Sequence, residues 1–120
     1  MATEWLRIET RTPRHPKIIR LAACLEMQPA YAFGHIAIFW LWALEFKPSG
    51  DVSDLTPTEI ATAASYTGDA ELFLASLHKA MLIDPDGMIH DWSEYAGSLL
   101  NAKAEAKERN RKYQEKARFK

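Results

Sequence analysis

The chain is poor in the residues that most often carry chemistry. Its single cysteine, Cys24, excludes an internal disulfide framework and a cysteine-rich zinc site, and favours a reducing compartment such as the cytoplasm. Its five glycines are scattered, so they form no glycine-rich phosphate loop. The four histidines lack metal-ligand spacing, and no two carboxylates form a credible acid–base pair. We therefore expect no enzyme activity, no cofactor and no metal.

Long apolar runs are also scarce. Residues 30–46 form the longest candidate, but they contain His35 and end next to Glu45, which favours a buried helix over a membrane span. The N-terminus lacks the basic and apolar regions of a signal peptide. From these observations we expect a cytoplasmic protein that does not enter a membrane.

Basic and acidic residues are nearly equal in number, which gives a net charge of -1, but the two kinds are unevenly distributed along the chain. Residues 1–20 carry five basic and two acidic side chains. Residues 21–100 carry two basic and eleven acidic side chains, and residues 101–120 carry eight basic and three acidic ones. Both ends are therefore suited to phosphate, which the middle would repel. The candidate DNA contacts are Arg7, Arg11, Arg14, Lys17, Arg20, Lys103, Lys107, Arg109, Arg111 and Lys112. Alternatively, they are solvated surface charges, and in residues 101–120 they support a helix through ion pairs.

The pattern of apolar residues predicts a mainly helical chain. Alternation over residues 6–9 predicts a short strand, and helices are expected over residues 17–26, after Pro16, and 30–46. Thr56 and Glu59 have the spacing of a capping box, which predicts a helix over residues 57–65. Asp69 is suited to cap another helix over residues 70–80.

A β-hairpin is predicted over residues 81–91, because Pro85, Asp86 and Gly87 favour a tight turn between two apolar pairs. A short extended piece is expected at residues 51–53. Ser93 is suited to cap a last helix toward Lys120, whose apolar seam weakens beyond residue 100. We therefore divide the chain into a domain at residues 1–100 and a basic helical arm at residues 101–120.

The helix over residues 30–46 is apolar on all sides, so it is either the central helix or part of it meets a second subunit. Its large side chains are candidates for core or subunit contact, and His35 is expected to be a satisfied core or interface histidine. The predicted oligomer interface consists of Phe33, Phe39, Trp40, Trp42 and Phe46.

Two short helices followed by a hairpin predict a winged helix-turn-helix, in which the second short helix usually reads the DNA groove. The alternative is a helical bundle with an unrelated hairpin. The predicted reading helix offers Lys79 but no Arg, Asn or Gln, and the hairpin carries Asp84, Asp86 and Asp91. We therefore expect DNA contact through the basic ends, mainly to phosphate and hardly sequence-specific.

Four segments together carry a resemblance to a known family: residues 5–10 (WLRIET), 13–17 (PRHPK), 40–44 (WLWAL) and 90–97 (HDWSEYAG). Residues 4–100 resemble the N-terminal winged-helix domain of phage and prophage replication proteins, the replisome organizers related to DnaD-like primosome proteins. The resemblance implies DNA binding, self-association and assembly with replication proteins, without catalysis. It also implies a short paralogue or a fragment, since such domains are often followed by a further region.

Three functions remain open. The first is a DNA-associated module of a phage-type replication initiation protein that binds through its basic ends and self-associates. The second is a protein-interaction or oligomerisation module of the same fold without direct DNA contact, which the acidic middle of the chain favours. The third is an acid-surfaced transcription regulator.

Overall fold

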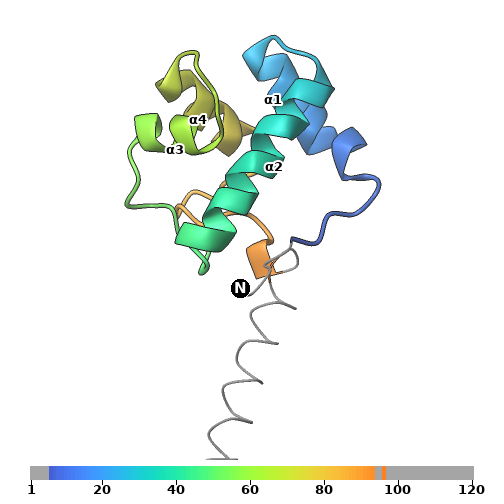
Figure 1. Ribbon diagram of the computed structural model, residues 1–120. Helices are drawn as coiled ribbons and strands as arrows, with labels where there is room; N and C mark the ends of the chain where they lie inside the picture. The colour runs from blue at the N-terminus through green and yellow to red at the C-terminus, as the bar shows by residue number, and fades with distance from the viewer. Residues whose placement is uncertain (1–5, 94–95, 97–120) are drawn as a thin grey trace, which may run out of the picture.

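The computed structural model describes residues 6–93 and residue 96. Over this part the chain is mainly helical, as predicted (Figure 1). A 3-10 turn, η1 (Thr12–Arg14), precedes four α-helices: α1 (Pro16–Leu25), α2 (Pro29–Phe46), α3 (Pro57–Ala63) and α4 (Ala70–Lys79). Helix α2 crosses the front of the molecule in Figure 1, with α1 on one side and α3 and α4 on the other. The predicted arm at residues 101–120 lies outside the described residues.

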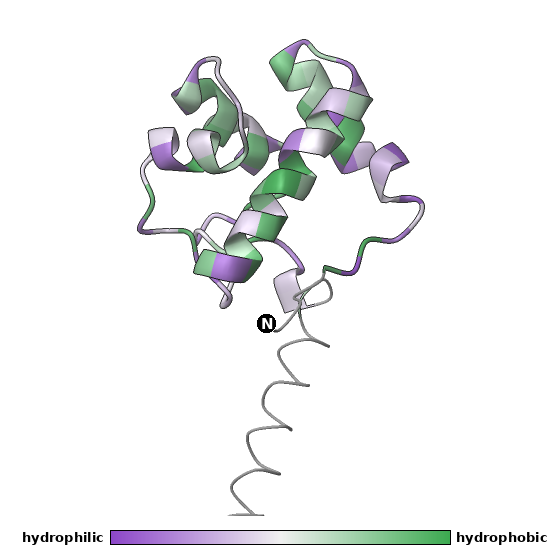
Figure 2. Ribbon diagram, in the orientation of Figure 1, coloured by the Kyte–Doolittle hydropathy of each residue, from purple (hydrophilic) through white to green (hydrophobic). Residues whose placement is uncertain are grey.

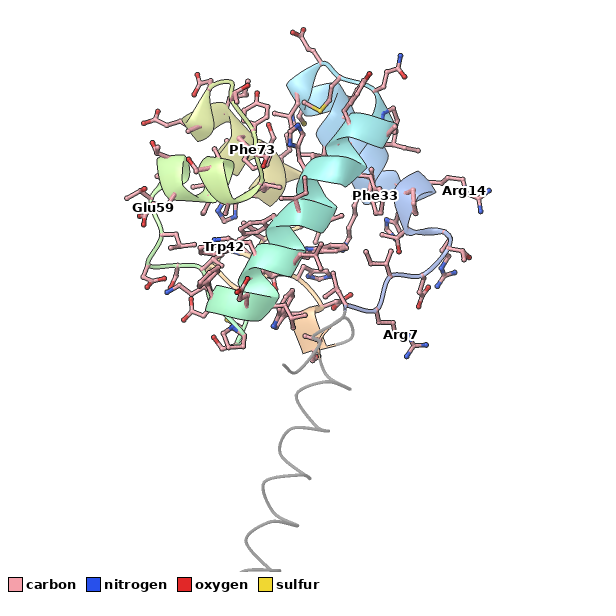
Figure 3. The ribbon with its side chains drawn as sticks, viewed as in Figure 1. Arg7, Arg14, Phe33, Trp42, Glu59 and Phe73 are labelled. Carbon is pink, nitrogen blue, oxygen red and sulfur yellow. The ribbon has the colours of Figure 1, made fainter. Side chains whose placement is uncertain are left out.

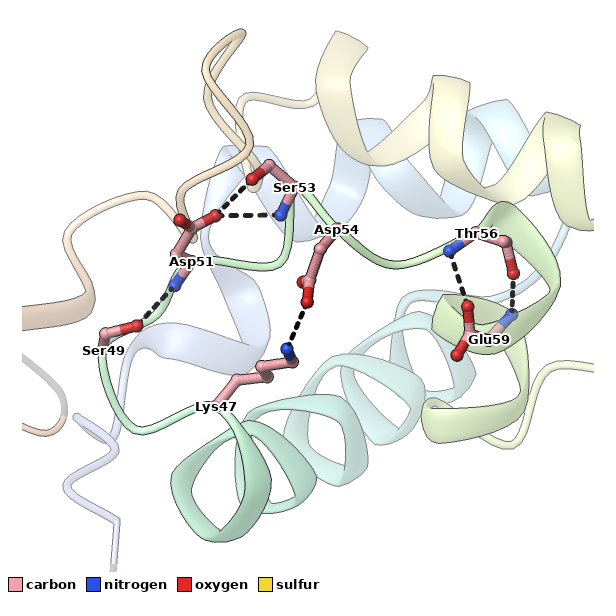
Figure 4. Close-up of polar contacts among 7 residues, drawn as sticks. All are labelled: Lys47, Ser49, Asp51, Ser53, Asp54, Thr56 and Glu59. Carbon is pink, nitrogen blue, oxygen red and sulfur yellow. Dashed lines mark hydrogen bonds and ion pairs between the residues drawn. The ribbon is translucent and has the colours of Figure 1, made fainter.

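The helices begin where local signals predict them to begin. Pro16, Pro29 and Pro57 each occupy the first turn of a helix, where a missing N–H leaves no bond unmade. At α3 the capping box is complete: the Glu59 N–H donates to Thr56 Oγ1 at 3.2 Å, and the Thr56 N–H donates to Glu59 Oε1 at 3.0 Å (Figure 4). These predicted helix starts are therefore confirmed.

Helix α4 also starts at its predicted cap. Asp69 Oδ1 accepts hydrogen bonds from the backbone N–H groups of Glu71 at 3.0 Å and Leu72 at 3.2 Å. The helix ends at Lys79, and α1 ends at Leu25 because Glu26 takes a left-handed conformation with φ of 53°. Each of these two ends lies one residue before the predicted one.

The predicted turn after α4 is present. The Gly87 N–H donates to the carbonyl oxygen of Asp84 at 2.9 Å, and the Asp84 N–H donates to that of Met88 at 2.8 Å. Ile83 and Ile89 form an antiparallel bridge across it. Gly87 has a φ of 89°, a conformation that glycine adopts without strain. The hairpin is held by isolated bridges rather than by long strands.

A third extended segment pairs with this hairpin. Asp51 and Met88 form an antiparallel bridge. The Val52 N–H donates to the Gly87 carbonyl oxygen at 3.0 Å, and the Ile89 N–H donates to that of Gly50 at 2.8 Å. The short extended piece expected near residues 51–53 thus joins the loop before α3 to the hairpin after α4.

The predicted strand over residues 6–9 is wrong. Residues 6–9 take part in neither of the two β-bridges found in the described part of the chain, and their backbone is irregular. Leu6 packs against the core, but Ile8 is 36% exposed, so the alternation marks one inward side chain rather than a buried sheet face. A strand needs a partner edge, which alternation alone does not supply.

One hydrophobic core joins all these elements. None of the helices in the described ranges has both the length and the hydropathy needed to cross a membrane. The core takes one face of each helix together with residues of the hairpin. Its largest fully buried side chains include Ile18, Leu21, Ile36, Phe39, Trp40, Ile60, Phe73, Leu77 and Ile89.

Candidate nucleic-acid interface

Two of the basic residues near the N-terminus, Arg7 and Arg14, lie on one edge of the molecule (Figure 3). Arg7 belongs to the irregular segment before η1, and Arg14 is the last residue of η1. In Figure 3 both side chains project outward on the side away from α3 and α4. Arg7, Arg11, Arg14 and Arg20 are exposed and Lys17 is half-buried, so all five reach the surface.

Local structure brings several of these groups close together. Arg11 precedes η1, and the Arg14 N–H donates to the Arg11 carbonyl oxygen at 3.0 Å, so the two arginines are one tight turn apart. Together with His15 and Pro16 they line a shallow depression of about 540 Å³. Lys17 and Arg20 follow in α1 with the three-residue spacing that places them on one helix face.

Most of these cations keep their charge free for a ligand. Arg11 Nε pairs with Glu9 Oε2 at 3.0 Å, but both side chains are more than half exposed, so the pair contributes about 0–1 kcal/mol to stability. Within residues 6–93, no acidic side chain lies within ion-pair distance of Arg7, Arg14, Lys17 or Arg20. Residues 6–20 therefore present five cations against Glu9 alone, and phosphate is the natural counter-ion for such an edge.

The segment that forms α3, α4 and the hairpin is acidic. Residues 47–93, which form α3, α4 and the hairpin, carry eight acidic residues and two lysines, Lys47 and Lys79. Lys47 Nζ is held by Asp54 Oδ2 at 2.7 Å (Figure 4), so its charge is already compensated. Lys79 at the end of α4 is exposed, and among the described residues it has no acidic partner.

Hydrogen bonds keep two of these carboxylates ionised. The Ser53 hydroxyl and backbone N–H donate to Asp51 Oδ1 at 2.6 and 3.0 Å, and these two bonds lower the pKa of Asp51 (Figure 4). The backbone and side-chain bonds between Thr56 and Glu59 lower the pKa of Glu59 in the same way. This segment therefore stays negative at neutral pH and repels a phosphate backbone.

The hairpin contributes further negative charge beside α4. His90 Nδ1 lies 2.7 Å from Asp84 Oδ1, and His90 Nε2 lies 3.4 Å from Asp91 Oδ2. The surface that would have to enter a DNA groove in standard docking thus combines Asp69, Glu71 and the aspartates of the hairpin.

The remaining candidates for chemistry are structural side chains. His35 Nδ1 bonds to the Ala64 carbonyl oxygen at 2.8 Å, and its ring meets the ring of Tyr66 edge-on, with centroids 5.5 Å apart. It is therefore the satisfied histidine that the sequence predicts. Cys24 is free and half-buried. No group of three or more possible metal ligands occurs within the ranges that the structure describes.

The predicted oligomer interface needs correction. Phe39 and Trp40 are 1% and 2% exposed and belong to the core, so they are not available to a second subunit. Phe33 and Trp42 are half-buried and lie on opposite sides of α2 in Figure 3. Of the five residues only Phe46, at the end of α2, is largely exposed. Total apolarity of the helix does not indicate which of its faces is covered.

The structure instead exposes apolar residues that the prediction missed. Tyr31, Ile38 and Leu41 lie on α2 and are 66%, 44% and 51% exposed. Their spacing of seven and three residues is the helical signal that could have found them, because it places all three on one face. The predicted contacts Lys103, Lys107, Arg109, Arg111 and Lys112 lie outside the described residues.

Comparisons of the chain with protein-family models, with curated proteins and with solved structures found no match.

Proposed function

We propose that this chain is a DNA-associated winged-helix module of a phage-type replication initiation protein, and that it self-associates. It binds DNA mainly through phosphate contacts, made by the N-terminal edge at Arg7, Arg11, Arg14, Lys17 and Arg20, with residues 101–120 as a second basic region. The role is binding and assembly rather than catalysis. The link to replication depends on the resemblance of residues 4–100 to replisome organizers.

The arrangement around α3 and α4 supports the winged-helix part of this proposal. Two short helices joined by a turn are followed directly by a hairpin, which is the element order of that fold. The hairpin also pairs with residues 50–52, just before the first of these helices. A helical bundle with an unrelated hairpin would have no reason to make this second pairing.

One observation carries the mode of binding. Arg7 and Arg14, which have no acidic partner among the described residues, project from the side of the molecule away from α3 and α4 (Figure 3), whereas the segment that forms α3, α4 and the hairpin carries eight acidic residues. Docking through α4 would press aspartates against phosphate, whereas docking through the N-terminal edge places Arg7 and Arg14 there. Contacts of this kind read no bases, so binding is weakly sequence-dependent and falls steeply with salt.

Fluorescence anisotropy of the full chain with labelled random duplex at low and moderate salt tests the proposal. We expect binding at low salt, and a double variant Arg14→Gln/Lys17→Gln should weaken it and reduce the salt slope by about 2, one for each cation lost. The single variant Arg14→Gln is compared with Lys79→Gln on α4, because each removes one exposed cation. Absence of binding at low salt, or a larger effect of Lys79→Gln, would contradict the proposal.

The second candidate function is a protein-interaction module without DNA contact. The acidic α4–hairpin surface and the exposed apolar face of α2 favour it, because both are suited to protein partners and neither to phosphate. The same titration separates the two functions, since this candidate predicts no binding to duplex or to single-stranded DNA at any salt concentration.

A further inference from the structure

We propose that the exposed face of α2 pairs with the same face of a second copy of this chain, with the two helices antiparallel. This inference deepens the self-association part of the proposed function and does not depend on the DNA part. The face, here named the α2 stripe, consists of Tyr31, Gly34, Ile38, Leu41 and Glu45. Successive members are three or four residues apart, so they follow one side of the helix.

The α2 stripe is not needed for the core. Ala32, Ile36, Phe39, Trp40 and Ala43 on the other side of the helix are buried and hold α2 against the rest of the molecule. In Figure 2 no other element of the described chain covers the front of α2. Tyr31, Ile38 and Leu41 nevertheless remain about half exposed or more, and a continuous apolar face of this kind is typical of a protein contact.

Charge along the α2 stripe favours a second copy as the partner. Glu45, near the C-terminal end, is its one charged member, while the N-terminal turn of α2 contains no acidic residue. Antiparallel pairing places Glu45 of each copy beside Tyr31 and the positive end of the helix dipole of the other. Parallel pairing would place the two Glu45 carboxylates together, which is unfavourable.

Gly34 gives the stripe its shape complementarity. No heavy atom lies within 4 Å of the position that a Cβ would take there, so the helix has an open notch between Tyr31 and Ile38. A small residue in a helix lets a neighbouring backbone or a large side chain approach closely. Under a two-fold axis the same notch receives the same projecting side chains on both copies, and the contact is self-complementary.

The size of the α2 stripe determines how strong the proposed dimer is expected to be. An 18-residue helix is about 27 Å long, and one helix pair buries less than the roughly 1,600 Å² of a standard interface. The dimer should therefore be weak and concentration-dependent. Because Arg7 and Arg14 project to the side of α2 in Figure 3, the dimer would leave both basic edges open to one DNA molecule.

Sedimentation velocity on the full chain, up to millimolar concentration, tests the contact. We expect a monomer–dimer equilibrium whose dissociation constant rises at least about tenfold in Ile38→Glu. Leu72→Glu is the matched control, since Leu72 is an apolar residue of α4 with 46% exposure, against 44% for Ile38. A monomer at all concentrations, or equal effects of the two variants, would overturn the proposal whatever the DNA titration shows.

Disulfide trapping tests the orientation in a Cys24→Ser background. Residues 31 and 45 are about 21 Å apart along α2. In an antiparallel dimer, a mixture of Tyr31→Cys and Glu45→Cys chains forms a mixed disulfide on mild oxidation, whereas each variant alone stays monomeric on a non-reducing gel. Disulfide dimers of either variant alone, without the mixed product, would overturn the antiparallel arrangement.

Discussion

The indole Nε1 of Trp92 donates a hydrogen bond to the carbonyl oxygen of Pro48 at 2.8 Å, joining two residues that are 44 positions apart. Trp92 is 4% exposed, and it follows the hairpin directly, while Pro48 lies in the loop after α2. The bond therefore fastens the hairpin to the same loop that supplies its third extended segment.

Replacing Trp92 should loosen this attachment in two steps. Trp92→Phe keeps a buried ring but removes the donor, and we expect a loss of about 1 kcal/mol in the free energy of unfolding. Trp92→Ala removes the ring as well, which should cost about 3–5 kcal/mol. Urea denaturation followed by far-UV circular dichroism measures both. Equal midpoints for wild type and Trp92→Ala would show that the hairpin is not held through this residue.

Two glycine substitutions should have opposite effects on the stability of the fold. Gly34→Ala adds a Cβ in open space in the middle of α2 and should stabilise the fold by about 0.5–1 kcal/mol. Gly50→Ala should destabilise it by more than 1 kcal/mol, because Gly50 has a φ of 82° and its added Cβ would overlap the Trp92 ring. Thermal melting of the two variants provides the comparison, and a shift of both melting temperatures in the same direction would contradict this account.

The capping box of α3 supports a matched pair of threonine variants. Thr56→Ala removes the side-chain acceptor for the Glu59 N–H and should cost about 1 kcal/mol. Thr58→Ala, two residues later in the exposed first turn of the helix, should be neutral or slightly stabilising because alanine favours helix. Chemical denaturation tests the difference, and equal stabilities of the two variants would contradict the role of the cap.

Stability should fall at acid pH partly through Asp51 and Glu59. Hydrogen bonds lower the pKa of both carboxylates in the folded chain, so their contribution is present above the pKa values of the unfolded chain and is lost as the pH falls through the lower pKa values of the folded chain. Melting temperature measured from pH 6 to 3 should therefore decrease less steeply in Glu59→Gln than in wild type. Identical slopes for wild type and Glu59→Gln would refute the linkage.

The structure agrees with the sequence wherever a local signal decides the outcome. Proline at the first turn of α1, α2 and α3, the side chain of Asp69 and the turn at Gly87 act over a few residues, so their effects were predictable. The exposure of the N-terminal arginines follows equally simply from the cost of burying charge.

Features that depend on distant partners were not predictable in this way. The alternation at residues 6–9 predicts a strand, but no partner edge lies beside it. Helix α2 is apolar all round, and packing rather than composition puts Phe39 inside and Ile38 outside. The placement of Arg7 and Arg14 on the side away from α3 and α4 likewise depends on how the helices pack (Figure 3).

Mapping the DNA-binding face by NMR tests the central claim most directly. In ¹H–¹⁵N spectra of the full chain titrated with a short random duplex at low salt, we predict that the largest shift changes within residues 6–93 fall at residues 7–20. Amides of α4 and of residues 84–91 should change little. Changes concentrated in α4 and the hairpin, with residues 7–20 unaffected, would contradict the account.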